Sequence, residues 1–144
     1  MTIMTAQELR KKIAIAQGEK ASAAMRARAA EEAEKQALLE KMSKPSGLSD
    51  DEIIEKASVI VNRAVENGLS SVQVFQFPHT LCTDNGRAIN QAEPGWEKTL
   101  TGMPKEIYEF WKRQLQSRGY HIRYEVVDYP GGMPGDIGII LSWH

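Results

Sequence analysis

Residues 120–143, YHIRYEVVDYPGGMPGDIGIILSW, contain two candidate strands on either side of a glycine-rich turn. The first strand, 120–129, alternates between apolar and polar side chains, and the second is 137–143. The apolar side chains on one face of the first strand are Ile122, Tyr124 and Val126. Two strands that are joined by a short turn rich in glycine form most simply an antiparallel hairpin, which we expect here.

A helix and a further strand are expected upstream of this hairpin. The helix covers residues 104–118, because proline is tolerated in a first helical turn and Gly119 is a favourable stop. The strand is 71–77 (SVQVFQF), which has β-branched and aromatic content and is closed by Pro78. Alternation along it places Val72 and Val74 on one face and Gln73, Phe75 and Phe77 on the other.

Another helix starts at Ser49, which has Glu52 three residues later in the pattern of a capping box. Apolar positions follow at helical spacing, and Gly68 supplies the expected left-handed end. The order of elements from residue 49 is therefore α-β-α-β-β. We expect an α/β (α+β) two-layer sandwich with a three-stranded mixed sheet, a parallel β-α-β crossover and both helices on one face.

The second face of such a sheet is open. The alternation of the strands assigns to this face four apolar side chains, Phe75, Phe77, Val127 and Ile140, among the polar His121, Arg123 and Glu125. An apolar patch of this kind needs a cover. The candidates are the long loop that follows the first strand, the N-terminal arm of the same or another copy, and a ligand.

Residues 1–44 are expected to form a long helical arm, followed by a linker at 45–48 and the domain at 49–144. The arm is rich in Ala, Glu, Lys, Arg and Leu and has no proline. Its thin apolar seam begins with Leu9 and Ile13, continues through alanines and is interrupted by Lys20 and Glu34. Alanine buries little area, so the arm needs a partner if it is ordered. The alternatives are a solvated helix, packing against a second copy or another protein, and nucleic-acid contact.

The net charge of −1 over 144 residues conceals an asymmetry. Residues 1–44 hold nine of the 18 basic residues and six of the 19 acidic ones, a charge of +3, so the remaining nine and 13 give residues 45–144 a charge of −4. No apolar run is long enough to span a bilayer and no secretory signal is recognisable at the start. With a single cysteine, these features favour a cytoplasmic protein without membrane contact.

The segment 77–102 shows neither helical nor strand periodicity over its length, and a connection that long is normally functional. It contains His79 and Cys82, whose spacing suits two zinc ligands or, as a weak catalytic candidate, a Cys-His pair. Two ligands do not complete a metal site, and neither an oxyanion hole nor a base can be identified. We therefore expect no metal and no cofactor.

Other candidates in this segment order the loop or bind a ligand. Asp84 opens a tight turn, and Arg87 could hold a phosphate or carboxylate, although a turn that bonds its own loop is the simpler interpretation. The complete set of ligand or loop-ordering candidates is Asp84, Arg87, Asn90, Arg123 and Asp136. The turn that contains Asp136 most simply shapes the hairpin; the functional alternative places it beside the 77–102 loop, with Asp136 paired to Arg87 or Arg123.

These features predict a non-catalytic interaction or assembly protein that forms a homo-oligomer or binds a protein partner. The contact surfaces are the N-terminal helix and the 77–102 loop, with Leu9, Ile13, Phe75, Phe77 and Trp96 as interface residues. One alternative is a nucleic-acid-binding protein that uses the basic arm and displays Phe75, Arg123 and Tyr129 on the open sheet face. The other is a small enzyme centred on the 77–102 loop.

Overall fold

The computed structural model describes residues 3–144, which divide into two compact units, one up to Leu38 and one from Leu39 to His144. The first unit is helical: α1 spans Ala6–Met42, and its last four residues belong to the second unit. Thr5 caps α1, since its Oγ1 accepts from the Glu8 backbone N–H and Glu8 Oε2 accepts from that of Thr5, both at 3.2 Å. Every described residue up to Leu38 is exposed. None of the helices within residues 3–144 combines the length and apolar character needed to cross a bilayer.

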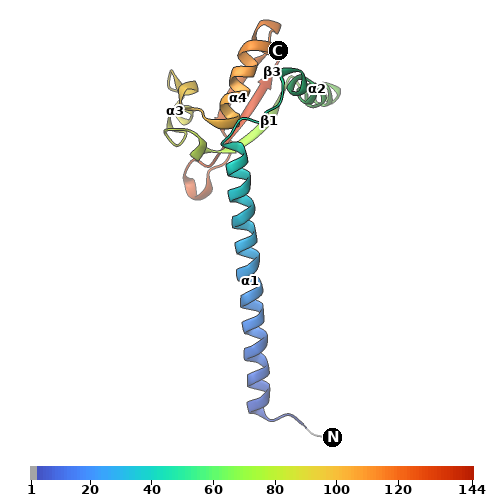
Figure 1. Ribbon diagram of the computed structural model, residues 1–144, viewed down its shortest axis with the longest axis vertical. Coiled ribbons are helices and arrows are strands. Elements are labelled where there is room, and N and C mark those ends of the chain that lie inside the picture. The colour runs from blue at the N-terminus through green and yellow to red at the C-terminus, as the bar shows by residue number, and fades with distance from the viewer. Residues whose placement is uncertain (1–2) are drawn as a thin grey trace. The chain divides into compact units, whose positions relative to one another are not determined.

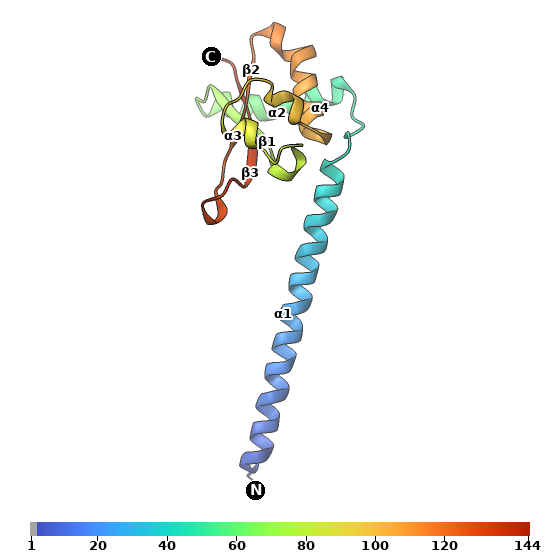
Figure 2. The ribbon, with the colours of Figure 1, turned by 90° about the vertical axis from the view of Figure 1, so that its left-hand side faces the viewer.

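The second unit has the expected α+β architecture, with helices against a three-stranded sheet (Figures 1 and 2). Its main elements are α2 (Asp50–Glu66), β1 (Ser71–Pro78), α3 (Arg87–Asn90), α4 (Gly102–Phe110), β2 (His121–Val126) and β3 (Asp136–Ser142). The predicted capping box of α2 is confirmed, because Ser49 and Glu52 bond each other reciprocally. Gly68 ends this helix region with a φ of 74°, which only glycine adopts readily.

The sheet is antiparallel throughout, which corrects the expected mixed sheet. The predicted β2–β3 hairpin is confirmed, but β3 inserts between β1 and β2 and pairs with both. β1 and β2 do run parallel to each other across the α4 connection, yet they are not neighbours. The physical reason is burial: the 137–141 run is the most apolar strand, and Ile137 and Ile139 in the centre are both 0% exposed.

A bulge in β1 overturns the predicted placement of Phe75 and Phe77. The register with β3 shifts between Gln73 and Phe75, so one extra residue, Val74, interrupts the alternation. Both phenylalanines then lie on the helix-covered face, and Phe77 is 1% exposed within the core. Burying a Phe side chain is worth roughly 1.5–3 kcal/mol, whereas a glutamine on that face would need polar partners, so the bulge is the favoured arrangement.

The open face of the sheet is largely polar as a result. Gln73 Nε2 donates to Gln76 Oε1 at 3.0 Å, and Gln76 Nε2 donates to Asp136 Oδ2 at 2.9 Å. Ile140 on this face is only 7% exposed between its strand partners Gln73 and Arg123. The large apolar patch that the strand alternation predicted is therefore not formed.

The 77–102 loop is folded over the same face as the helices. Short helical turns at His79–Leu81, Arg87–Asn90 and Trp96–Thr99 give it local structure. Its apolar side chains enter the core beside Phe77, Ile137 and Ile139; they are Leu81, Cys82, Ile89 and Leu100. Trp96 packs against Tyr124 and Tyr108, with ring centroids 5.0 and 5.6 Å apart. The loop is thus a structural cover for one end of the sheet.

Candidate functional site

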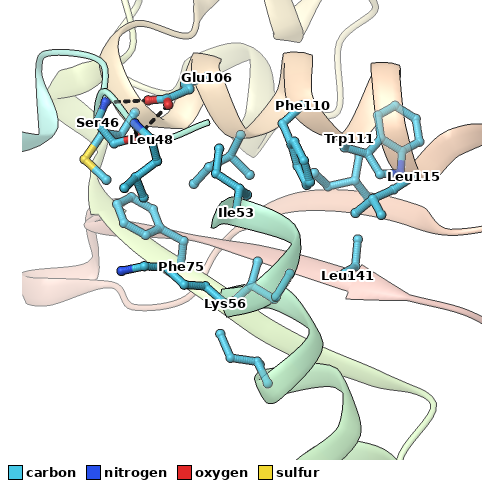
Figure 3. Close-up of a pocket in the computed structure, with 16 residues that line it drawn as sticks. Ser46, Leu48, Ile53, Lys56, Phe75, Glu106, Phe110, Trp111, Leu115 and Leu141 are labelled. Carbon is cyan, nitrogen blue, oxygen red and sulfur yellow. Dashed lines mark hydrogen bonds between the residues drawn. The ribbon is translucent and has the colours of Figure 1, made fainter. Parts of the chain in front are cut away.

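An apolar cleft of about 340 Å³ lies between α2 and α4 in the second unit (Figure 3). Its floor is the helix-covered face of the sheet, with Phe75, Ile122 and Leu141. Ile53 stands on the α2 side, and Phe110 projects from α4. Ligand pockets in proteins are lined in the same way, by apolar and aromatic side chains with few polar groups.

Two sets of hydrogen bonds connect the α2 region to the α4 region. One joins the first residue of α2 to the turn after α4, and the other joins the linker before α2 to α4 itself. Asp50, the first residue of α2, accepts from Arg113 Nη2 at 2.8 Å and from Gln114 Nε2 at 2.9 Å. The hydrogen bond from Arg113 is the largest cause that lowers the pKa of Asp50. In the linker, Ser46 donates to Glu106 through its backbone N–H at 2.7 Å and its hydroxyl at 2.6 Å. These bonds keep the first turn of α2 and the linker close to α4, whereas the middle of α2 faces the cleft.

The shape of the α4 wall depends on a change of helical pitch. The sequence predicts one helix over 104–118, but α4 ends at Phe110 and the chain continues as a π-helical turn, Trp111–Leu115, and a 3₁₀ turn, Gln116–Arg118. Single π turns within helices occur frequently at functional sites. Here the wide turn carries Trp111 and Leu115 into the lining, and Trp111 Nε1 donates to the Tyr120 carbonyl at 3.0 Å.

Lys56 and Glu106 are the charged side chains that line the cleft. Glu106 is occupied by the two bonds from Ser46. Lys56 is exposed, and no carboxylate of the described residues 3–144 lies within 4.0 Å of its ammonium group. Figure 3 shows its side chain extending from α2 toward Phe75. The cleft therefore combines an apolar interior with one available cation at its edge.

The Cys82 thiol, the weak catalytic candidate, is buried and 3% exposed. Burial raises its pKa to about 11, so it is protonated near neutral pH and is a poor nucleophile. His79 Nδ1 lies 3.0 Å from the Gly135 carbonyl and ties the loop to the hairpin turn. Among the described residues, no three His, Cys, Asp or Glu side chains are grouped as metal ligands.

The loop-ordering candidates make short-range contacts. Asp84 accepts from the backbone N–H groups of Gly86 at 3.0 Å and Ala88 at 2.9 Å, which fixes the turn before α3. The Arg87 guanidinium lies 3.9 Å from the Glu93 carboxylate at the surface. Asn90 Oδ1 accepts a long bond of 3.4 Å from the Tyr129 hydroxyl. These contacts order the loop without forming an anion pocket around Arg87.

The alternative ion pair between Asp136 and an arginine is not formed among the described residues. Asp136 accepts from Gln76, Arg123 bonds the Glu125 carboxylate at 3.1 Å, and Arg87 lies near Glu93. The reason is proximity: alternate residues of β2 share the open face of the sheet, so Arg123 meets Glu125 first.

In the first unit, the seam residues Leu9 and Ile13 are 46% and 57% exposed on α1. Comparison with models of known families, with curated proteins and with solved structures finds no match for this chain. The exposed helix and the apolar cleft are the two features from which the functional proposals start. The sequence predicted the exposed helix but not the cleft, because the cleft depends on how two helices that are distant in sequence pack on one face of the sheet.

Proposed function

We propose that the chain is a non-catalytic assembly protein that associates through α1 with a second copy or with another protein. The observation that carries this proposal is the state of residues 6–38, all of which are exposed. A helix that is solvated on all sides needs either many ion pairs of its own or a partner. Among the described residues, the one ion pair that involves a side chain of α1 joins Glu40 to Lys44, which follows the helix, and lies outside the range 6–38.

The exposed apolar side chains of α1 support the same function. Leu9, Ile13 and Leu38, which lie on one side of the helix, are between 46% and 57% exposed. Burying such side chains against another helix would stabilise α1, because each contributes roughly 1.5–3 kcal/mol when fully removed from water. The exposed part of the 77–102 loop around Arg87 is the second proposed contact surface.

The proposed location is the cytoplasm, with which the single unpaired cysteine agrees.

The test is sedimentation of the full chain over a range from about 1 to about 100 µM, because association by mass action depends on concentration. Self-association predicts a rise in mass across this range. The double variant Leu9→Glu, Ile13→Glu should shift the chain toward monomer. Ile15→Glu is the matched control, since residue 15 lies about 120° or more around the helix from residues 9 and 13. A monomer at every concentration that also captures no protein through α1 refutes the proposal.

The cleft supports a second candidate function, the binding of a small amphipathic ligand with an apolar chain and an anionic head. An engineered apolar cavity of about 150 Å³ binds benzene, so a cleft of about 340 Å³ has room for a longer chain. The Lys56 ammonium at the edge is placed to meet a carboxylate. Decanoate is the probe, with decanol as its uncharged analogue and the change in tryptophan fluorescence as the signal, since Trp111 lines the cleft.

A filled cleft should abolish this binding. Ala57→Phe places a ring in the lining and should remove decanoate binding, whereas Val59→Phe, at a 57% exposed position of the same helix, should leave it unchanged. Lys56→Gln should weaken decanoate about threefold, as expected for an exposed ion pair, without affecting decanol. Decanoate affinities that are equal in the Ala57 and Val59 variants refute ligand binding in the cleft.

The two alternatives drawn from sequence have lost specific support. The nucleic-acid hypothesis needs Phe75 on the open face for base stacking, and Phe75 lines the cleft on the other face. The enzyme hypothesis needs a reactive Cys82, and its thiol is buried with a raised pKa. A binding assay across salt concentrations tests nucleic-acid binding directly, because phosphate contacts weaken as salt rises.

A further inference from the structure

Charge is unevenly distributed along α1. Residues 6–28 carry six basic and two acidic side chains, a net charge of +4, and residues 29–38 carry one basic and three acidic side chains, a net charge of −2. All of these side chains are exposed. A helix with a positive first part and a negative second part attracts a copy of itself that runs in the opposite direction, and repels one in parallel register.

The apolar positions of α1 indicate which side of the helix would contact the second copy. At 100° per residue, Leu9, Ile13 and Leu38 fall on one side of the helix, and Ala16 and Ala27 lie between them. Small residues between larger ones allow a second helix to approach closely. The side chains that interrupt this face are Lys20 and Glu34, one from each charged part of the helix.

We propose that two copies of the chain pair through α1 in antiparallel orientation, centred near Ala27, so that Lys20 of each copy lies opposite Glu34 of the other. The inference rests on the proposed assembly function and names its partner and geometry. The same register sets Leu38 of one copy against Ala16 of the other, large against small. Parallel pairing would set Lys20 against Lys20 and Glu34 against Glu34, which like-charge repulsion disfavours. The two interruptions of the apolar face thereby become specificity contacts.

Charge reversal tests the orientation. In sedimentation equilibrium of the full chain, Lys20→Glu or Glu34→Lys alone should weaken dimer formation about tenfold, because each change turns two attractive contacts repulsive. The double variant K20E/E34K restores both pairs and should recover the affinity to within about threefold. Lys11→Glu is the matched control: it makes the same change in charge on the far side of the helix and should cost less than about threefold.

Cysteine crosslinking gives an independent measure in a Cys82→Ala background. Antiparallel pairing brings the two Ala27→Cys sulfurs together at the centre, so that variant should form a disulfide dimer under mild oxidation. Two Ala16→Cys positions would lie about 33 Å apart along the pair and should not crosslink. Parallel pairing predicts that both variants crosslink equally.

The outcomes separate the two proposals. A chain that is monomeric at all concentrations refutes self-association and this inference together, and leaves binding of another protein through α1 as the form of the proposed function. A chain that dimerises but crosslinks at Ala16→Cys refutes the antiparallel geometry alone. Failure of K20E/E34K to recover affinity does the same.

Discussion

The replacement of Phe77 by alanine tests the bulge in β1 and, through it, the character of the open sheet face. Phe77 is 1% exposed and lies between Phe75 and Tyr124, with ring centroids 6.4 and 6.1 Å away. An aromatic side chain buries about 150–250 Å², which at about 25 cal/mol per Å² gives roughly 4–6 kcal/mol as an upper value. Phe→Ala changes in protein cores cost about 3–5 kcal/mol, so we expect a loss of this size.

Urea unfolding followed by tryptophan fluorescence measures the change in the free energy of unfolding. Gln76→Ala is the control, because Gln76 is the preceding residue of the same strand and lies exposed on the open face. Its loss should be within about 1 kcal/mol, as for other exposed hydrogen bonds. If Phe77→Ala fails to fold, Phe77→Leu should fold with a smaller loss, since it leaves a smaller cavity.

The reasoning is refuted if Phe77→Ala costs no more than Gln76→Ala. Unbroken alternation in β1 predicts that result, because Phe77 would then face solvent and its truncation would change stability by about 0.5 kcal/mol or less. The same result would restore the apolar open face and with it the need for a cover. The experiment therefore decides between two arrangements of one strand.

Three further changes probe other parts of the second unit. Gly138→Ala should destabilise it by about 1–3 kcal/mol in urea unfolding, because the added Cβ would lie 2.7 Å from Val127 Cγ1. The pKa of Cys82 is raised from 9.0 to about 11, so between these pH values the folded state keeps a proton that the unfolded state releases. The stability of the protein should therefore fall as the pH rises from 9 to 11. Thermal unfolding scans should show a smaller fall for Cys82→Ala. The lowered pKa of Asp50 contributes stability above the ordinary value of 3.8 that is lost as the pH drops through the lowered value, so Asp50→Asn should flatten the acid side of the same profile. Equal pH profiles for the parent and the Cys82 or Asp50 variant would contradict the corresponding assignment.

Local signals made much of the fold predictable from sequence. The capping box at Ser49, the glycine after α2 and the turn between β2 and β3 each act within a few residues, and the structure has all three. The long N-terminal helix was predictable for the same reason, because its composition favours a helix at nearly every position. Where neighbours in sequence determine the conformation, a single sequence carries the information.

Strand order and strand face were not predicted, because they depend on distant residues. Alternation in 71–77 leaves a glutamine on each face, and one extra residue at Val74 gathers Gln73 and Gln76 on one side. That spacing of three between the glutamines was the available signal for a bulge. The unbroken apolar run of β3 similarly indicated a central strand, since only a strand with neighbours on both sides buries such a run.

The candidate site was predictable in part for a related reason. The segment 77–102 was singled out for its length and apolar content, and its apolar side chains do enter the core, but as a cover for the sheet. The cleft could not be predicted from the sequence, because its two sides are brought together by contacts between distant residues, such as that of Asp50 in α2 with Arg113 in the turn after α4, 63 residues apart. No periodicity within either helix reports the space left between them.

The bulge also changes where exposed apolar side chains are found in the chain. With Phe77 in the core and glutamines on the open face, the sheet no longer presents a large apolar surface for another molecule to cover. The exposed apolar side chains of α1 remain, and the interruptions among them, Lys20 and Glu34, are opposite in charge. A lone solvated helix gives no reason for one positive and one negative residue on its apolar face, whereas an antiparallel pair places each against the other. The proposed self-association through α1 would account for the exposed apolar residues and for the residues that interrupt them.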